Sequence, residues 1–80
     1  MSDEDILAGI QEVARVHLGW EDALTPELRL IEDLRLDSIR LLTLAAEVEN
    51  RFRVLLDELD EGAIATVGDL VSVIRRKLGG

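Results

Sequence analysis

Residues 34–52 of this 80-residue chain read LRLDSIRLLTLAAEVENRF, and they carry its most informative pattern. Drawn as a helix from about Ser38 to Phe52, the segment gathers one apolar stripe, made of Leu41, Leu44, Ala45, Val48 and Phe52. A second apolar strip lies beside it and consists of Ile39, Leu42 and Ala46. Together they cover an arc of about 220°, whereas a core-facing helix needs only about 100°. We therefore expect the stripe to be buried and the strip to stay partly exposed for a partner.

Helices are predicted on both sides of this segment. The first spans about Asp3 to Leu18 and ends at Gly19, because its apolar residues recur with helical spacing. The last begins after Thr66, since residues 66–69 (TVGD) resemble a capping box. A short helix from Asp57 to about Ala65 is weakened by Gly62, and residues 52–56 are interpreted as the start of an extended link.

These elements predict an all-α fold: a four-helix bundle of three longer helices and one short one, with a long first loop from about Gly19 to Asp37. The whole chain, residues 1–80, is expected to form a single domain. The predicted core consists of Ile6, Ile10, Val13, Leu41, Ala45, Val48, Phe52, Leu70 and Ile74.

Composition excludes several classes of function. The chain has no cysteine and one histidine, which rules out disulfides, thiolate nucleophiles and His- or Cys-rich metal sites. Its net charge of −8 argues against binding to nucleic acid or to anionic membranes, and Arg75, Arg76 and Lys77 are interpreted as a favourable charge at a helix end.

We expect His17 to be a half-buried packing residue. No apolar run approaches a membrane span and the N-terminus does not resemble a signal peptide, so a cytoplasmic location is expected.

The pair Asp37-Ser38 starts the second predicted helix, and either side chain can cap it. Ser38 also lies where backbone N–H groups and the helix dipole favour an anion. No histidine or lysine lies near it in sequence to activate the hydroxyl as a nucleophile. The pattern therefore favours a residue that another enzyme modifies over a catalytic one.

Three motifs in order resemble the acyl carrier proteins of the phosphopantetheine-binding family. Residues 36–39 (LDSI) are similar to the family's Asp-Ser-Leu site, residues 52–54 (FRV) to its Phe-x-Ile/Val, and residues 66–70 (TVGDL) to the entry of its fourth helix. Each motif alone is weak, but the spacing fits and the resemblance spans essentially the whole chain.

The resemblance implies that Ser38 carries 4′-phosphopantetheine, added from coenzyme A by a phosphopantetheinyl transferase that uses Mg²⁺. The arm's thiol would hold acyl groups as thioesters. The domain itself would then not be an enzyme and would have no catalytic residues. Asp37 would help to hold the site for the transferase, and Ile39 would pack beside the arm. Partner docking would involve Arg40, Leu42, Ala46 and Glu49. The implied partners are the transferase and acyl-loading and acyl-processing enzymes of ligase, acyltransferase or ketosynthase type, and the expected state is a monomer.

The chain also departs from the family pattern. Family members commonly have acids after the serine, whereas this chain has Arg40, and the segment 38–52 is neutral overall. This favours a dedicated carrier in polyketide or specialised fatty-acyl biosynthesis over a general fatty-acid carrier. Two alternatives stay open: an aminoacyl or peptidyl carrier, and a non-carrier helical protein-interaction domain in which Ser38 is only a cap.

Overall fold

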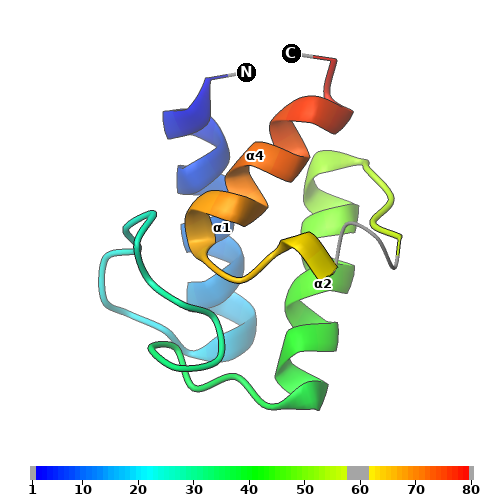
Figure 1. Ribbon diagram of the computed structural model, residues 1–80. Coiled ribbons are helices and arrows are strands. Elements are labelled where there is room, and N and C mark those ends of the chain that lie inside the picture. The colour runs from blue at the N-terminus through cyan, green and yellow to red at the C-terminus, as the bar shows by residue number, and fades with distance from the viewer. Residues whose placement is uncertain (1, 58–61, 80) are drawn as a thin grey trace.

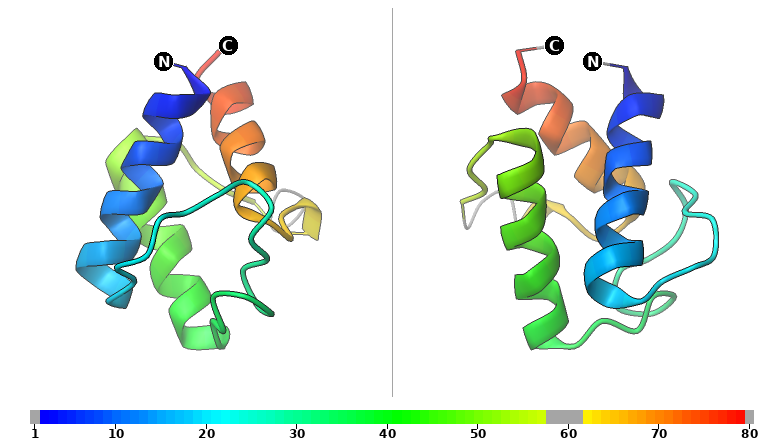
Figure 2. Two further views of the ribbon diagram at one scale, coloured as in Figure 1. Left: turned by 90° about the vertical axis from the view of Figure 1, so that its left-hand side faces the viewer. Right: turned by 180° about the vertical axis from the view of Figure 1, so that it is seen from behind.

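The computed structural model describes residues 2–57 and 62–79, and helices dominate both parts (Figure 1). They are α1 (Asp3–Leu18), α2 (Ser38–Phe52) and α4 (Val67–Lys77). α1 packs against both α2 and α4, and the views in Figure 2 place the two termini at one end of the molecule and the start of α2 at the other. Within these described ranges there is no strand beyond an isolated bridge, so the all-α prediction is confirmed.

The predicted short helix over residues 57–65 is only partly visible. Residues 58–61 lie outside the described residues, while 62 and 63 have helical backbone. The fourth helix of the bundle therefore stays a prediction. The link that precedes it, residues 54–57, has no regular secondary structure, as expected for an extended connection. No helix in the described part of the chain is both long and apolar enough to cross a membrane.

The helix boundaries follow from local capping chemistry. Ser2 caps α1, because its hydroxyl accepts a hydrogen bond from the Asp5 backbone N–H at 3.2 Å and the Asp5 carboxylate bonds back to Ser2. Gly19 closes the helix with φ 69°, a left-handed conformation that glycine adopts without steric cost. Thr66 and Asp69 form the same reciprocal box at the start of α4, so these predicted boundaries are confirmed.

The capping box of α4 makes stability depend on pH. Hydrogen bonds from the backbone N–H groups of Ala65 and Thr66 lower the pKa of the Asp69 carboxyl. Because the unfolded chain binds this proton more tightly, the stabilisation is present above the unfolded pKa of about 4 and is lost as pH falls through the lowered folded pKa. We expect Asp69→Asn to lower the melting temperature at neutral pH and to differ less from the parent below about pH 3. Circular dichroism melts across this range test it, and a difference that does not change with pH would contradict it.

The buried side of α2 differs from the predicted one in one respect. Leu44, Val48 and Phe52 are buried and define the centre of the core-facing stripe. Leu41 and Ala45 are only half-buried, so their assignment to the core is corrected. The other predicted core residues, on α1, α2 and α4, are all buried. The helix is turned so that Leu41 and Ala45 lie at the edge of the core.

The long first loop supplies a part of the core that the sequence analysis did not anticipate. Four of its leucines are at most 6% exposed, namely Leu24, Leu30, Leu34 and Leu36. The Gln11 side chain of α1 holds the start of the loop, donating to the Asp22 carbonyl at 2.9 Å and accepting from the Leu24 N–H at 2.7 Å. Further on, the Leu30 N–H donates to the Ala65 carbonyl at 3.1 Å and the Val67 N–H to the Leu28 carbonyl at 2.9 Å. The loop is thereby fixed across the entry to α4.

Candidate functional site

Ser38 is the first residue of α2, and the structure separates its role from that of Asp37. The Asp37 carboxylate accepts the Arg40 backbone N–H at 2.8 Å, so Asp37 is the N-cap. Ser38 is exposed and does not cap the helix. The first backbone N–H groups of a helix have no partner within it and carry the positive end of its dipole. The Ser38 oxygen therefore lies where a phosphate attached to it is electrostatically favoured.

A cavity of about 810 Å³ lies beside Ser38. It is open on one side and is lined by α2, by residues 29–32 of the first loop and by residues 64–66 before α4. Its lining is mainly apolar and includes Leu30, Ile31, Leu41, Leu42, Ala45, Leu56, Ile64 and Leu70. The half-buried positions of Leu41 and Ala45 are explained by this cavity, because both line it. An apolar chain attached through Ser38 would thus have an apolar space next to its point of attachment.

The wall contributed by the loop is held by two kinds of contact. Arg29 and Glu32, which both line the cavity, form an ion pair at 2.7 Å, and the Arg29 N–H donates to the Asp33 carboxylate at 2.7 Å. Arg29 also pairs with Thr66 in an isolated antiparallel bridge. The sequence analysis did not assign residues 29–32, Leu56 or Ile64 to the site. The recurring leucines of the first loop are the sequence feature that could have indicated that this loop packs beside the site.

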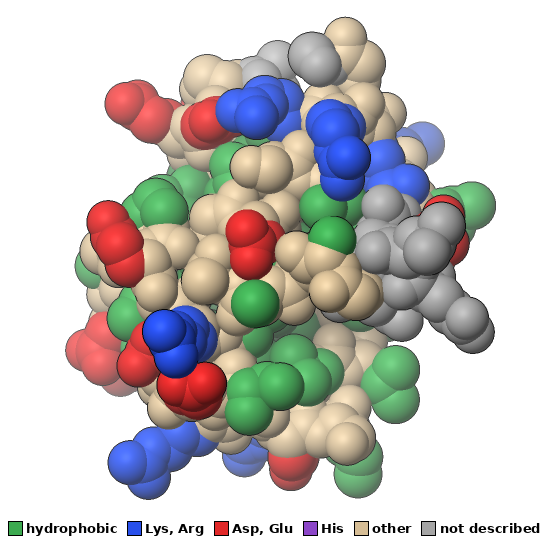
Figure 3. Space-filling model, viewed as in Figure 1, with side chains coloured by type: hydrophobic (Ala, Val, Ile, Leu, Met, Phe, Trp, Pro, Cys, Tyr) green, Lys and Arg blue, Asp and Glu red, His purple; other side chains and the backbone are tan. Residues whose placement is uncertain are grey.

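The predicted docking residues divide into exposed and engaged side chains. Ile39 is 75% exposed and Leu42 66%, and Ala46 and Arg40 are also exposed. Figure 3 shows hydrophobic side chains gathered on the lower part of the molecule, towards the end where α2 begins. Glu49 differs, because its carboxylate accepts the Leu56 N–H at 2.7 Å and so braces the link after α2. The exposure of the second apolar strip agrees with the helical wheel, while a docking role for these residues stays a prediction.

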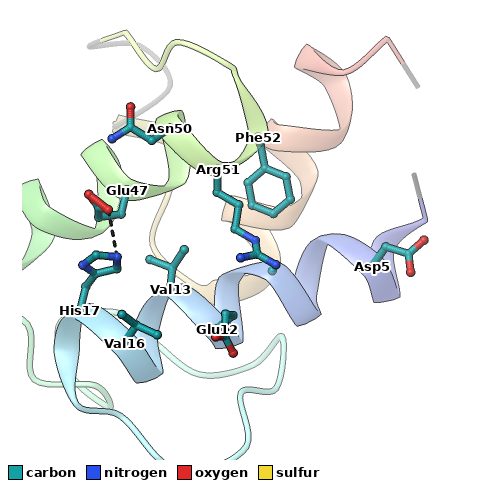
Figure 4. Close-up of a pocket in the computed structure, with 10 residues that line it drawn as sticks. Asp5, Glu12, Val13, Val16, His17, Glu47, Asn50, Arg51 and Phe52 are labelled. Atoms are coloured by element: carbon teal, nitrogen blue, oxygen red, sulfur yellow. Dashed lines mark ion pairs between the residues drawn. The ribbon is translucent and has the colours of Figure 1, made fainter.

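A second groove, of about 650 Å³, lies between α1 and α2 (Figure 4). His17 Nε2 lies 3.0 Å from a carboxylate oxygen of Glu47, and the His17 side chain is 40% exposed. The expectation of a half-buried packing histidine is confirmed in part, because the His17 side chain lies between the two helices, but it also contacts Glu47 there. Ser38 does not line this groove. Within the described residues no group of three or more His, Cys, Asp or Glu side chains is placed to hold a metal ion.

Comparison with known proteins gives consistent relatives. No protein-family model matches the chain. It is 39% identical over 79 residues to an acyl carrier protein from Thermotoga maritima, covering 98% of both chains. It is 32% identical over 77 residues to the meromycolate extension acyl carrier protein of Mycobacterium leprae, covering 95% of this chain and 67% of that one. A solved structure assigned as an acyl carrier protein of Mycobacterium tuberculosis superposes with a TM-score of 0.73 at 31% identity, covering 92% of this chain and 95% of that one.

Proposed function

The chain belongs to the acyl carrier protein family, whose members are carriers and not enzymes, and we propose that Ser38 is its attachment site for 4′-phosphopantetheine. The observation that carries the proposal is the exposed Ser38 hydroxyl at the first position of α2, beside an apolar cavity of about 810 Å³. When bound, the group supplies a thiol that holds acyl chains as thioesters. This would account for thiol chemistry in a chain that has no cysteine.

The residues around Ser38 fit such a group. Asp37 satisfies the N–H of Arg40, and this leaves the Ser38 oxygen outside the capping interaction. The N–H groups of the first turn of α2 favour the phosphate without requiring a basic side chain. Ile39 is exposed next to the attachment point, where it would pack beside the arm. Leu41, Ala45 and the loop wall would shelter an apolar acyl chain from water.

We infer that the cargo is a fatty-acyl chain in a specialised pathway. The lining of the cavity is apolar, and relatives in mycobacteria are named for meromycolate extension. Polyketide assembly uses the same kind of carrier and stays part of the proposal. The aminoacyl and peptidyl alternative is less favoured, because the relatives compared are named acyl carriers. The proposed partners are a phosphopantetheinyl transferase and acyl-loading and acyl-processing enzymes, acting on a monomeric four-helix bundle.

Incubation of the purified chain with coenzyme A, Mg²⁺ and a promiscuous phosphopantetheinyl transferase tests the carrier function. Intact-mass spectrometry should show an increase equal to one 4′-phosphopantetheinyl group, and peptide mapping should place it on Ser38. A chain that stays unmodified would favour the non-carrier alternative, a protein-interaction domain in which the exposed apolar strip binds a partner.

The exposed strip beside Ser38 gives a prediction about docking. Leu42→Asp should reduce acyl transfer by a processing enzyme, because it places a charge in the apolar area a partner must cover to reach the arm. Leu42 is 66% exposed, so the free energy of unfolding should change by no more than about 0.5 kcal/mol. Transfer kinetics and circular dichroism on the same samples measure both effects.

A matched control is available on α1. Val16 is 56% exposed and lines the other groove, so Val16→Asp makes the same chemical change away from Ser38. Glu47→Ala, which removes only the partner of His17, should also transfer normally. If Leu42→Asp unfolds the domain, or if Val16→Asp is equally impaired, the strip has no special part in docking.

A further inference from the structure

The charged side chains around the start of α2 fall into two groups. All the acidic side chains between residues 32 and 49 accept a hydrogen bond or form an ion pair within the chain. Their partners are Arg29 for Glu32, the Arg29 N–H for Asp33, the Arg40 N–H for Asp37, His17 for Glu47 and the Leu56 N–H for Glu49. These carboxylates are committed to the fold of the carrier itself. Each of them therefore has a partner within the chain before another protein binds.

The two arginines that flank Ser38 are in the opposite situation. Arg35 precedes Ser38 by three positions and Arg40 follows it by two, and both are exposed. Among the residues that the structure describes, neither guanidinium group forms an ion pair or hydrogen bond. The unpaired charges immediately before and after Ser38 are therefore positive, in a chain whose net charge is −8.

Both arginines are also unfavourable choices for the local structure. Arg35 has φ 56°, a left-handed conformation that suits glycine or asparagine and that is rare for other residues. Arg53 has the same φ, but it caps the end of α2, where this conformation is common. Arg40 puts a cation in the first turn of α2, where the helix dipole disfavours positive charge and the N-cap Asp37 is the acid that offsets the dipole. Residues that are unfavourable for the local backbone conformation or helix charge, and that gain no contact within the fold in return, are expected at functional sites.

Exposed apolar side chains lie on the same first two turns of α2 as Arg40. Ile39 and Leu42 are the large exposed hydrophobic residues of α2, and they lie on the first two turns with Ser38 and Arg40. We propose that Arg35, Ile39, Arg40 and Leu42 form a docking face for partner enzymes that present carboxylates around an apolar centre. This inference rests on the carrier function proposed above and specifies the chemistry of the partner.

Charge complementarity argues for a partner enzyme with an acidic surface at this face. A basic partner surface would meet two unpaired guanidinium groups, whereas an acidic one would meet them as counter-ions. The chain is acidic overall, but a second basic group, Arg75, Arg76 and Lys77, lies in the last turn of α4, so net charge alone does not direct an acidic partner to this face. Arg35 and Arg40 would supply complementary charge once the partner lies at this face, and Ile39 and Leu42 would supply the contact area.

The test uses the phosphopantetheinyl transferase of the same organism, three single variants of the full chain and the double variant at Arg35 and Arg40. Arg35→Gly removes a charge and relieves the left-handed backbone, and Arg40→Glu places an acid where the helix dipole favours one. Arg76→Glu is the matched control, because it makes the same charge reversal on α4, at the end of the molecule opposite the start of α2 (Figure 1). Arm addition is followed by intact mass to give kcat/KM, and melting temperatures are measured in parallel.

We expect kcat/KM to fall on the order of tenfold in Arg40→Glu at low salt, less in Arg35→Gly, and further when both are combined. Melting temperatures should stay the same or rise. The losses should shrink at about 0.5 M salt, because screening acts on exposed charges. Equal losses in Arg76→Glu, unchanged rates, or faster rates in the Arg35 and Arg40 variants would overturn the docking proposal while leaving the carrier function intact. If even the parent chain is never modified, the carrier function fails, and this inference fails with it.

Discussion

Ser38→Ala is expected to abolish the addition of phosphopantetheine and to leave the fold essentially unchanged. The hydroxyl is the only group that the substitution removes, and no arm can be attached without it. The structure assigns the N-cap to Asp37, so the loss of the Ser38 hydroxyl should change the free energy of unfolding by no more than about 0.5 kcal/mol. Intact mass after reaction with coenzyme A and transferase measures the first effect, and urea unfolding measures the second.

Two controls make this result specific. Ser72 is exposed on α4, and Ser72→Ala should be modified like the parent chain. Asp37→Ala separates the cap from the attachment group: it should lose about 1 kcal/mol of stability because it removes a helix cap, and arm addition should be slower but not abolished, because Asp37 is expected to help hold the site for the transferase while the Ser38 hydroxyl is kept. Arm addition that persists in Ser38→Ala would move the attachment site elsewhere and remove the basis of the proposed function.

The sequence predicts the fold well where capping residues and apolar periodicity coincide. The bounds of α1 and α2 and the start of α4 match the expectation, because Ser2, Asp37, Thr66 and Gly19 are strong local signals. The orientation of α2 is less predictable. An apolar arc of about 220° does not show which of its residues face the core. Packing against the neighbouring helices buries Leu44, Val48 and Phe52. Tertiary packing makes that choice.

The site is predictable in its chemistry but not in its surroundings. The motif around Ser38 identifies the attachment residue, because a serine at a helix start next to a capping aspartate is a local feature. The cavity beside it depends on contacts between distant segments, residues 29–32 with 64–66, which periodicity within one helix cannot show. Likewise, the engagement of Glu49 with the link and of Glu47 with His17 depends on three-dimensional packing. The charge balance of the docking face therefore becomes visible only in the structure.

Phe52 is the position where the largest loss of stability is expected. It is 7% exposed at the end of α2, and it is the only aromatic residue besides Trp20 in an otherwise aliphatic core. Figure 4 shows its ring directed towards α1. A Cβ atom built on Gly9 of α1 would lie 2.5 Å from Phe52 Cζ, so the ring occupies a space that only a glycine leaves open. The Phe52 ring of α2 therefore packs against α1 at the position where Gly9 has no side chain.

Phe52→Ala should lower the free energy of unfolding by about 3–5 kcal/mol, because it removes buried apolar surface and leaves a cavity between the helices. Small domains have a total stability of about 5–15 kcal/mol, so urea unfolding should show a marginally folded variant. Gly9→Ala should cost about 1–3 kcal/mol through overpacking against the same ring. The two losses should not add, because alanine at position 9 no longer meets a ring once Phe52 is truncated. Additive losses would show that the ring does not occupy the space beside Gly9, and a Phe52→Ala variant as stable as the parent would show that this contact does not hold α1 to α2.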